Sequence, residues 1–350
     1  MIRRNLELVM KTKFTSTVLA FTGLIVLTAY LSGCGSSGGN NNHELLNVSY
    51  DPTRELYEEL NKQFVASYAK ETGQEINVKQ SHGGSAAQAR AVLDGLEADI
   101  VTLALPSDTD VLAKKGLIDP DWEKRLPNES LPYYSTIVFV VRKGNPKNIK
   151  DWPDLIEGEV SIITPNPKTS GNGKLSFLAA WGAVIKRGGS EQAARDYVTN
   201  LYKRVPVLDS GARGATTTFV QKNLGDVQIT WENEAHYEIE EAKGQLEIIY
   251  PPISIKAEPK VALVDANVKK KGTQAAAEAY LKYLYTAEAQ ETFAKYYYRP
   301  SQEDVLKKYT ERLPPIDLFS ISSFAESWNA AQQKFFAADG VFDSIYLPKN

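Results

Sequence analysis

The stretch IITPNPKTSGNG, residues 162–173, is where we expect the functional site of this chain. A short β-branched run enters a loop with two prolines, which leaves through small residues into an apolar, helix-like run from Leu175 to Ile185. The first N–H groups of a helix have no partner inside it, and the helix dipole favours negative charge there. A strand, a small-residue turn and a helix start therefore predict an anion-binding site.

The same arrangement recurs at three other places. A predicted strand precedes each of the junctions Tyr50-Asp51-Pro52, Gly83-Gly84-Ser85 and Gly211-Ala212, the last after residues 205–208. Trp231 ends another predicted strand, and its indole offers a donor only. One such junction is most often a packing turn, but four that share a cleft would suit a small, fully deprotonated tetrahedral oxyanion.

Strands alternate with helices along the whole chain, which is typical of an α/β fold with mainly parallel sheets. The pattern also predicts one long helix over residues 275–297. A polar connection near residue 125 suggests two lobes with the ligand between the carboxyl ends of their strands. We expect a first lobe made of residues 44–126 and 233–305. The second lobe is expected to contain residues 127–232, with C-terminal helices in 306–350.

Composition excludes one large class of partner. The 350 residues are 43% apolar and 24% charged, as in an ordinary soluble protein, and the net charge is −3. Residues 1–33 carry four basic side chains and one acidic one, so the remainder carries −6. A mildly acidic protein without a basic block argues against binding to nucleic acid.

The N-terminal segment is interpreted as an export signal over residues 1–33, with a basic start, an apolar stretch and small residues before Cys34. The tetrad Leu-Ser-Gly-Cys at 31–34 resembles a bacterial lipobox and implies a lipid on Cys34, the only cysteine. The alternatives are a plain signal peptide or an uncleaved membrane helix. Residues 34–43 are expected to be a flexible Gly/Ser/Asn tether.

Eight blocks carry a family resemblance. They are LLNVSYDPTRELY (45–57), QSHGGS (80–85), EADIVTLAL (97–105), STIVFVVRKGNPK (135–147), ITPNPKTSG (163–171), LDSGARG (208–214), WENEA (231–235) and EAYLKYLY (278–285). From Leu45 onward the chain thereby resembles the periplasmic sulfate-binding proteins of bacterial ABC importers for sulfate or thiosulfate. The resemblance implies a type II periplasmic-binding-protein fold, whose two lobes close over a dehydrated sulfate.

The resemblance also implies a set of ligand residues. The expected donors are the backbone N–H groups of Asp51, Gly171, Asn172 and Ala212, the N–H and hydroxyl of Ser85, the hydroxyl of Ser170 and the indole N–H of Trp231. Asn172 stands where other members can have a glycine, but its backbone donor remains. The Asp51 carboxylate is expected to turn away from the anion. Behind these residues we expect His82 and Arg213. Arg213 is expected to hydrogen-bond to the carbonyl of a loop.

The resulting hypothesis is a monomeric periplasmic sulfate receptor that is anchored through the lipid on Cys34. It delivers the anion to a membrane permease, needs no cofactor or metal, and is not an enzyme. A donor-only site would reject protonated phosphate. The rivals are a thiosulfate receptor of the same family and, from another class, a phosphate- or sulfate-ester hydrolase with His82 as its base. The three histidines are scattered, and residues around Lys174 fail the nucleotide P-loop pattern.

Overall fold

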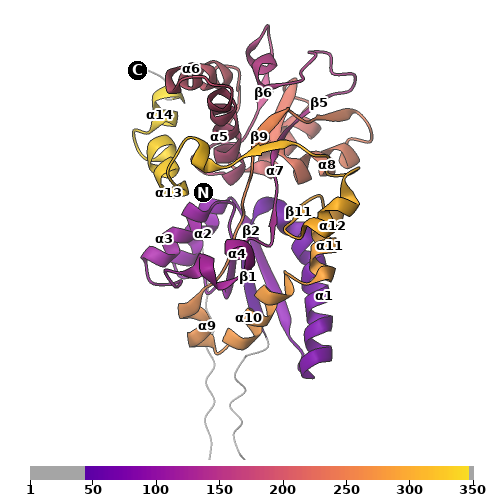
Figure 1. Ribbon diagram of the computed structural model, residues 1–350, viewed down its shortest axis with the longest axis vertical. Coiled ribbons are helices and arrows are strands. Elements are labelled where there is room, and N and C mark those ends of the chain that lie inside the picture. The colour runs from indigo at the N-terminus through magenta and orange to yellow at the C-terminus, as the bar shows by residue number, and fades with distance from the viewer. Residues whose placement is uncertain (1–43, 347–350) are drawn as a thin grey trace, which may run out of the picture. The chain divides into compact units, whose positions relative to one another are not determined.

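The computed structural model describes residues 44–346. The expected signal segment, the lipobox cysteine Cys34 and the tether lie outside the described residues. Within residues 44–346, no helix has both the length and the apolar character needed to cross a bilayer. The described part forms two α/β lobes (Figure 1), so the expected two-lobed α/β fold is confirmed, but the sheet of the second lobe is not mainly parallel as expected.

The first lobe is built on a four-stranded sheet of order β10-β3-β1-β2, in which β1 runs parallel to β2 and β3. Its strands are β1 (Glu44–Tyr50), β2 (Asn77–Gly83), β3 (Ile100–Thr102) and β10 (Val261–Leu263). Its helices are α1 (Arg54–Thr72), α2 (Ser85–Leu93), α3 (Pro106–Lys114), α4 (Pro127–Ser130), α9 (Asp265–Lys271), α10 (Gln274–Tyr283), α11 (Ala287–Lys295) and α12 (Glu303–Leu306). Apolar clusters cover both faces of this sheet.

The second lobe is built on a four-stranded sheet of order β6-β7-β5-β8. Its strands are β5 (Ile137–Arg142), β6 (Ile162–Ile163), β7 (Val227–Trp231) and β8 (Leu246–Ile249). Its helices are α5 (Gly171–Lys186), α6 (Glu191–Tyr202), α7 (Ala212–Thr216), α8 (Glu232–Glu241), α13 (Trp328–Ala331) and α14 (Val341–Tyr346). β6 runs parallel to β7, whereas β5 runs antiparallel to both of its neighbours.

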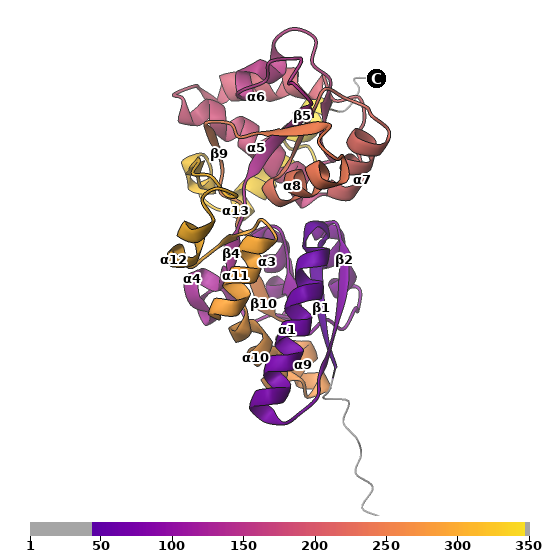
Figure 2. The same cartoon turned by 90° about the vertical axis from the view of Figure 1, so that its right-hand side faces the viewer.

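Short paired segments connect the lobes (Figure 2). β4 (Tyr133–Tyr134) pairs with β11 (Arg299–Pro300), and β9 (Ile253–Ile255) pairs with β12 (Asp317–Phe319). Between these pairs, Ser135 and Ala257 exchange backbone hydrogen bonds of 3.0 and 2.9 Å. Hydrogen-bonded extended segments of this kind suit a hinge, because small dihedral changes in a few residues can move a lobe.

The lobe composition differs from the expected one in the segment after Trp231. Residues 233–305 were expected in the first lobe, but β8 pairs with β5 of the second sheet. α8 packs on the same sheet through Ala235, in a cluster with Val138 and Val140. The sequence pattern marks a strand and its buried face but does not identify the sheet that the strand joins.

Two predicted elements are also wrong. Residues 205–208 form no strand, because Pro206 has no N–H to donate to a ladder. This segment only flanks β6, through the bonds Ile162 N–H to Arg204 O and Asn166 N–H to Asp209 O. The long helix predicted over residues 275–297 is two helices, since the side chain of Thr286 accepts from Ala289 N–H and starts α11 afresh.

A buried ion pair braces the joint between the lobes. Glu232 begins α8 at the end of β7, and Arg299 lies in β11. Arg299 Nε and Nη2 donate to the two carboxylate oxygens of Glu232, each at 2.7 Å, and both side chains are at most 4% exposed. A second bond from Arg299 Nη2 reaches Pro314 O at 2.8 Å.

Replacing Glu232 by alanine should lower the free energy of unfolding by about 3–5 kcal/mol, because the buried Arg299 charge loses its partner. Chemical denaturation measures this change. Lys307 serves as the control, since its ion pair with Asp304 is exposed, and Lys307→Ala should change the value by less than about 0.5 kcal/mol. Equal effects of the two variants would contradict the bracing role.

A second prediction concerns pH. Glu238 is fully buried and accepts hydrogen bonds from Thr216 Oγ1 at 2.7 Å and Gln228 Nε2 at 2.9 Å. Burial raises the pKa of Glu238 from its usual 4.5 to about 8, and that of the neighbouring Glu234 to about 7. The folded protein keeps these protons while the unfolded chain releases them, so stability should fall as pH rises from about 5 to about 8.

Glu238→Gln keeps the shape and removes the ionisable proton. Relative to the wild type it should gain about 3–4 kcal/mol of unfolding free energy between pH 5 and pH 8, since one pKa unit corresponds to about 1.4 kcal/mol. Urea unfolding at several pH values measures the difference. An identical pH slope in both proteins would show that Glu238 does not titrate in this range.

Candidate functional site

The four junctions meet at one small cavity. Its volume is about 10 Å³, and residues of both lobes line it: Tyr50, Asp51, Pro52, Gly83, Gly84, Ser85, Ala104, Ser170, Gly171, Asn172, Ala212 and Trp231. All seven residues expected to hold the ligand are among them. The cavity lies where the carboxyl ends of β1, β2 and β7 meet the starts of helical segments.

Five backbone N–H groups of the lining are free of protein acceptors. They belong to the first or second residue of a helical segment: Asp51 of the 3₁₀ turn Asp51–Thr53, Ser85 of α2, Gly171 and Asn172 of α5, and Ala212 of α7. No acceptor for any of the five lies in the part of the chain that the structure describes. Such N–H groups carry the positive end of the helix dipole.

Two side chains add donors to the same cavity. Ser170 caps α5, and its Oγ accepts from Gly173 N–H at 3.3 Å, which leaves its own proton available. Trp231 is fully buried and packs its ring against Tyr50 at 5.4 Å. Its indole Nε1 has no hydrogen-bond partner among residues 44–346. A buried donor without an acceptor is costly, so this N–H indicates a place for a ligand.

Ser85 differs from the expectation that its hydroxyl serves the ligand. Its Oγ donates to Asp108 Oδ2 at 2.6 Å and accepts from Ala104 N–H at 3.0 Å. The single hydroxyl proton is therefore committed to Asp108, and only the backbone N–H of Ser85 stays unpaired.

A cross-lobe ion pair behind Ser85 was missed in the sequence. Lys174 of α5 donates to Asp108 Oδ1 of α3 at 3.1 Å, and both side chains are less than one tenth exposed. Lys174 lies one turn after Ser170, but no spacing rule connects it with a carboxylate 66 positions away. The pair neutralises a charge that would otherwise repel an anion.

The Asp51 carboxylate has a cation near it. Its Oδ1 is 3.5 Å from Arg54 Nη2, and its side chain is 19% exposed. Burial raises the pKa of Asp51, although Arg54 and Arg213 pull it down. The carboxylate therefore already interacts with a cation of its own lobe.

Arg213 and His82, the two residues expected behind the ligand donors, have different kinds of partner. Arg213 does not hold a loop carbonyl: its Nη2 donates to Glu55 at 2.7 Å, and its Nε lies 2.9 Å from Glu234. His82 Nδ1 lies 3.5 Å from the Tyr50 carbonyl oxygen. Burial lowers the pKa of His82 to about 4, so its ring is neutral at pH 7.

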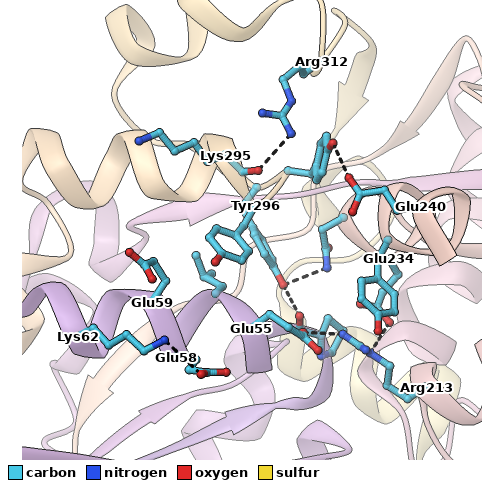
Figure 3. A pocket seen from close by; sticks show the side chains of 16 residues that line it. Glu55, Glu58, Glu59, Lys62, Arg213, Glu234, Glu240, Lys295, Tyr296 and Arg312 are labelled. Carbon is cyan, nitrogen blue, oxygen red and sulfur yellow. Dashed lines mark hydrogen bonds and ion pairs between the residues drawn. The ribbon is translucent and has the colours of Figure 1, made fainter.

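A larger pocket of about 430 Å³ has Arg213 in its lining (Figure 3). Carboxylates of Glu55 and Glu234 face Arg213 there, while Lys295 and Arg312 lie across the pocket. The mixture of carboxylates and cations gives this pocket no preference for an anion. No group of three or more potential metal-ligating side chains occurs anywhere in residues 44–346.

Known proteins resemble this chain over most of its length. Residues 46–299 match the family described as "Bacterial extracellular solute-binding protein". The "Sulfate-binding protein" of Escherichia coli (strain K12) is 55% identical over 304 residues, which are 86% of this chain and 92% of that protein. The "Thiosulfate-binding protein" of Pseudomonas aeruginosa is 48% identical over 306 residues, 87% of this chain and 92% of that one.

Solved structures agree. The sulfate-binding protein SubI from Mycobacterium tuberculosis H37Rv superposes with a TM-score of 0.76 at 33% identity, covering 84% of this chain and 99% of its own. The resemblance noted in the sequence blocks is thus confirmed across the described lobes. The chain belongs to the bacterial extracellular solute-binding protein family.

Proposed function

We propose that this protein is an extracytoplasmic receptor that binds sulfate and delivers it to an ABC importer. The buried indole N–H of Trp231 carries the proposal, because it points to a ligand acceptor in a cavity that already gathers five free backbone N–H groups. Relatives named as sulfate- and thiosulfate-binding proteins support it.

The chemistry of the lining suits a fully deprotonated oxyanion. None of the twelve lining residues is Lys, Arg or His, so the charge of the ligand is met by dipoles. A hydrogen bond to a charged group contributes about 1.5–3 kcal/mol, and several of them offset the dehydration of the ion. A protonated phosphate would bring a hydrogen that needs an acceptor.

Closure of the lobes completes the site. Asp51 and Ser85 come from the first lobe, whereas Ser170 to Asn172, Ala212 and Trp231 come from the second. The lobes touch at glycines: a Cβ on Gly84 would lie 2.7 Å from Thr169 O. Because the donors are divided in this way, the anion interacts best with the closed state and shifts the population toward it.

The proposal assigns the ligand to the N–H groups of Asp51, Ser85, Gly171, Asn172 and Ala212, the Ser170 hydroxyl and the Trp231 indole. It also includes a periplasmic location, a lipid on Cys34 as the membrane anchor, a permease as partner, and a monomer without cofactor or catalysis. The closed lobes would present a joint surface to that permease.

A thiosulfate receptor is the nearest alternative, and the thiosulfate-binding relatives favour keeping it in the test. An ester hydrolase finds less support. Its candidate base His82 has a pKa lowered to about 4 by burial, and its Nδ1 lies near a backbone carbonyl. Turnover of a phosphate or sulfate ester, lost in His82→Ala, would favour the hydrolase.

The Trp231 indole gives the first test. Trp231→Phe should weaken sulfate binding by about tenfold to a hundredfold, because one charge-assisted bond is lost. Calorimetric titration with sulfate, thiosulfate, phosphate and molybdate measures affinity and preference. Trp181 is the matched control: its buried Nε1 also lacks a partner within residues 44–346, but it packs in the second-lobe core. Trp181→Phe should leave affinity unchanged, and failure of the wild type to bind any of the four anions would refute the proposal.

Lobe contact gives a second test. In Gly171→Ala the new methyl would lie 2.5 Å from Ala104 Cβ and 3.3 Å from Ser85 Cβ. Overpacking of this kind costs about 1–3 kcal/mol, so sulfate affinity should fall by about fivefold to 150-fold. Adding Ala104→Gly removes the opposing methyl and should restore part of the affinity. If Gly171→Ala binds sulfate as tightly as the wild type, the sulfate-bound protein does not have the close lobe contact described here.

A further inference from the structure

The side chain of Asn172 has a role that its backbone does not explain. Asn172 is the second residue of α5, and its N–H is one of the proposed sulfate donors. Its side chain is buried, with the residue only 2% exposed, and lies between α5 and β7. A buried amide must satisfy both of its polar atoms, and its partners show what it holds in place.

Both amide atoms have buried partners. Asn172 Nδ2 donates to Thr230 Oγ1 at 3.1 Å, and Oδ1 accepts from Ser176 Oγ at 3.0 Å. Thr230 is fully buried and Ser176 is 2% exposed. The Ser176 Oγ also lies 3.5 Å from Ile229 O, which adds a weaker link between α5 and β7. The amide orientation is thus determined from two sides.

The bond to Thr230 connects two groups of ligand donors. Thr230 directly precedes Trp231, whose indole N–H is the buried donor of the cavity. Asn172 directly follows Ser170 and Gly171, which supply the hydroxyl and another N–H. The Asn172 amide therefore connects the start of α5, which carries three of the donors, to strand β7, which carries the Trp231 indole.

We infer that the Asn172 side chain is a positioning residue that sets the spacing between the α5 donors and the Trp231 indole. This inference rests on the proposed function. All residues concerned belong to the second lobe, so the spacing is established before the lobes close. Donors fixed in advance lose less freedom on binding and hold the anion more tightly.

The same spacing selects between anions. Sulfate presents four equivalent oxygens, whereas thiosulfate replaces one of them by a larger sulfur atom. Donors held at one distance fit one size, and donors released from that constraint adapt to both. Loss of the amide link should therefore weaken sulfate binding more than thiosulfate binding.

The test combines substitutions on both sides of the bond in the chain from His43 onward. Asn172→Ala keeps the backbone donor and removes the amide, Thr230→Val removes the hydroxyl without changing the shape, and Thr230→Ser retains the hydroxyl. Asn61 provides a matched control in α1. Its amide is also buried, donating to Gln80 Oε1 at 3.4 Å and accepting from the Tyr280 hydroxyl at 2.6 Å, but it lies outside the cavity lining.

Calorimetric titration with sulfate and thiosulfate and thermal unfolding without ligand should be measured for every variant. Asn172→Ala and Thr230→Val should each lose about tenfold in sulfate affinity and show a lower sulfate-to-thiosulfate ratio. The double variant should lose little more than either single one, because both break the same link. Thr230→Ser should stay within about twofold of the wild type, and Asn61→Ala should lower only the unfolding temperature.

The outcomes separate the two proposals. Unchanged sulfate affinity and ratio in Asn172→Ala and Thr230→Val, together with a lower unfolding temperature, would make the amide purely structural while the receptor function stands. A wild type that binds none of the anions would overturn both. The threonine variants alter a single atom group, so they keep the inference testable if Asn172→Ala does not fold.

Discussion

Five backbone N–H groups at the starts of four helical segments have no acceptor within residues 44–346, and much of the site is arranged around that deficit. In water such groups would be satisfied by solvent, but here they surround a small cavity beside the fully buried Trp231. Buried donors require an acceptor. A dehydrated anion, the proposed ligand, would supply acceptors to all of them at once, and for this reason the proposal links anion binding to the closed arrangement of the lobes.

The charged side chains near the cavity are consistent with the same principle. Lys174 is paired with Asp108 across the lobes, and Arg213 is held between Glu55 and Glu234. The positive charge of each of these side chains is thus compensated by at least one carboxylate, as buried charges require, and does not serve as a direct partner for a ligand in the cavity. The anion would then be stabilised by oriented backbone dipoles that need no reorganisation, and closure would bury the Lys174–Asp108 pair together with one bound ion.

Small and short polar residues let this geometry form. Gly84 and Gly171 allow the lobes to approach until a single methyl would collide, and Ser170 caps α5 while keeping its own proton free. Asn172 adds a bond between α5 and β7 inside the second lobe. Close approach of the lobes therefore depends on the lack of a side chain at Gly84 and Gly171. The spacing of donors within the second lobe depends on the side chain of Asn172.

The sequence by itself determined features that depend on near neighbours in the chain: a helical segment follows each of the four junctions, although α5 begins at Gly171 rather than at Leu175, and apolar strands alternate with the helices. It was wrong where distant contacts decide, as for the sheet that β8 joins, and it also missed two local signals, Pro206 in a supposed strand and the Thr286 cap within a supposed long helix. Only the tertiary structure decided that the four junctions share one cavity, that Asp108 takes the Ser85 proton, and that Lys174 lies beside it. Local patterns specify which face of an element is buried, whereas the partner of that face is selected by the packing of the whole chain.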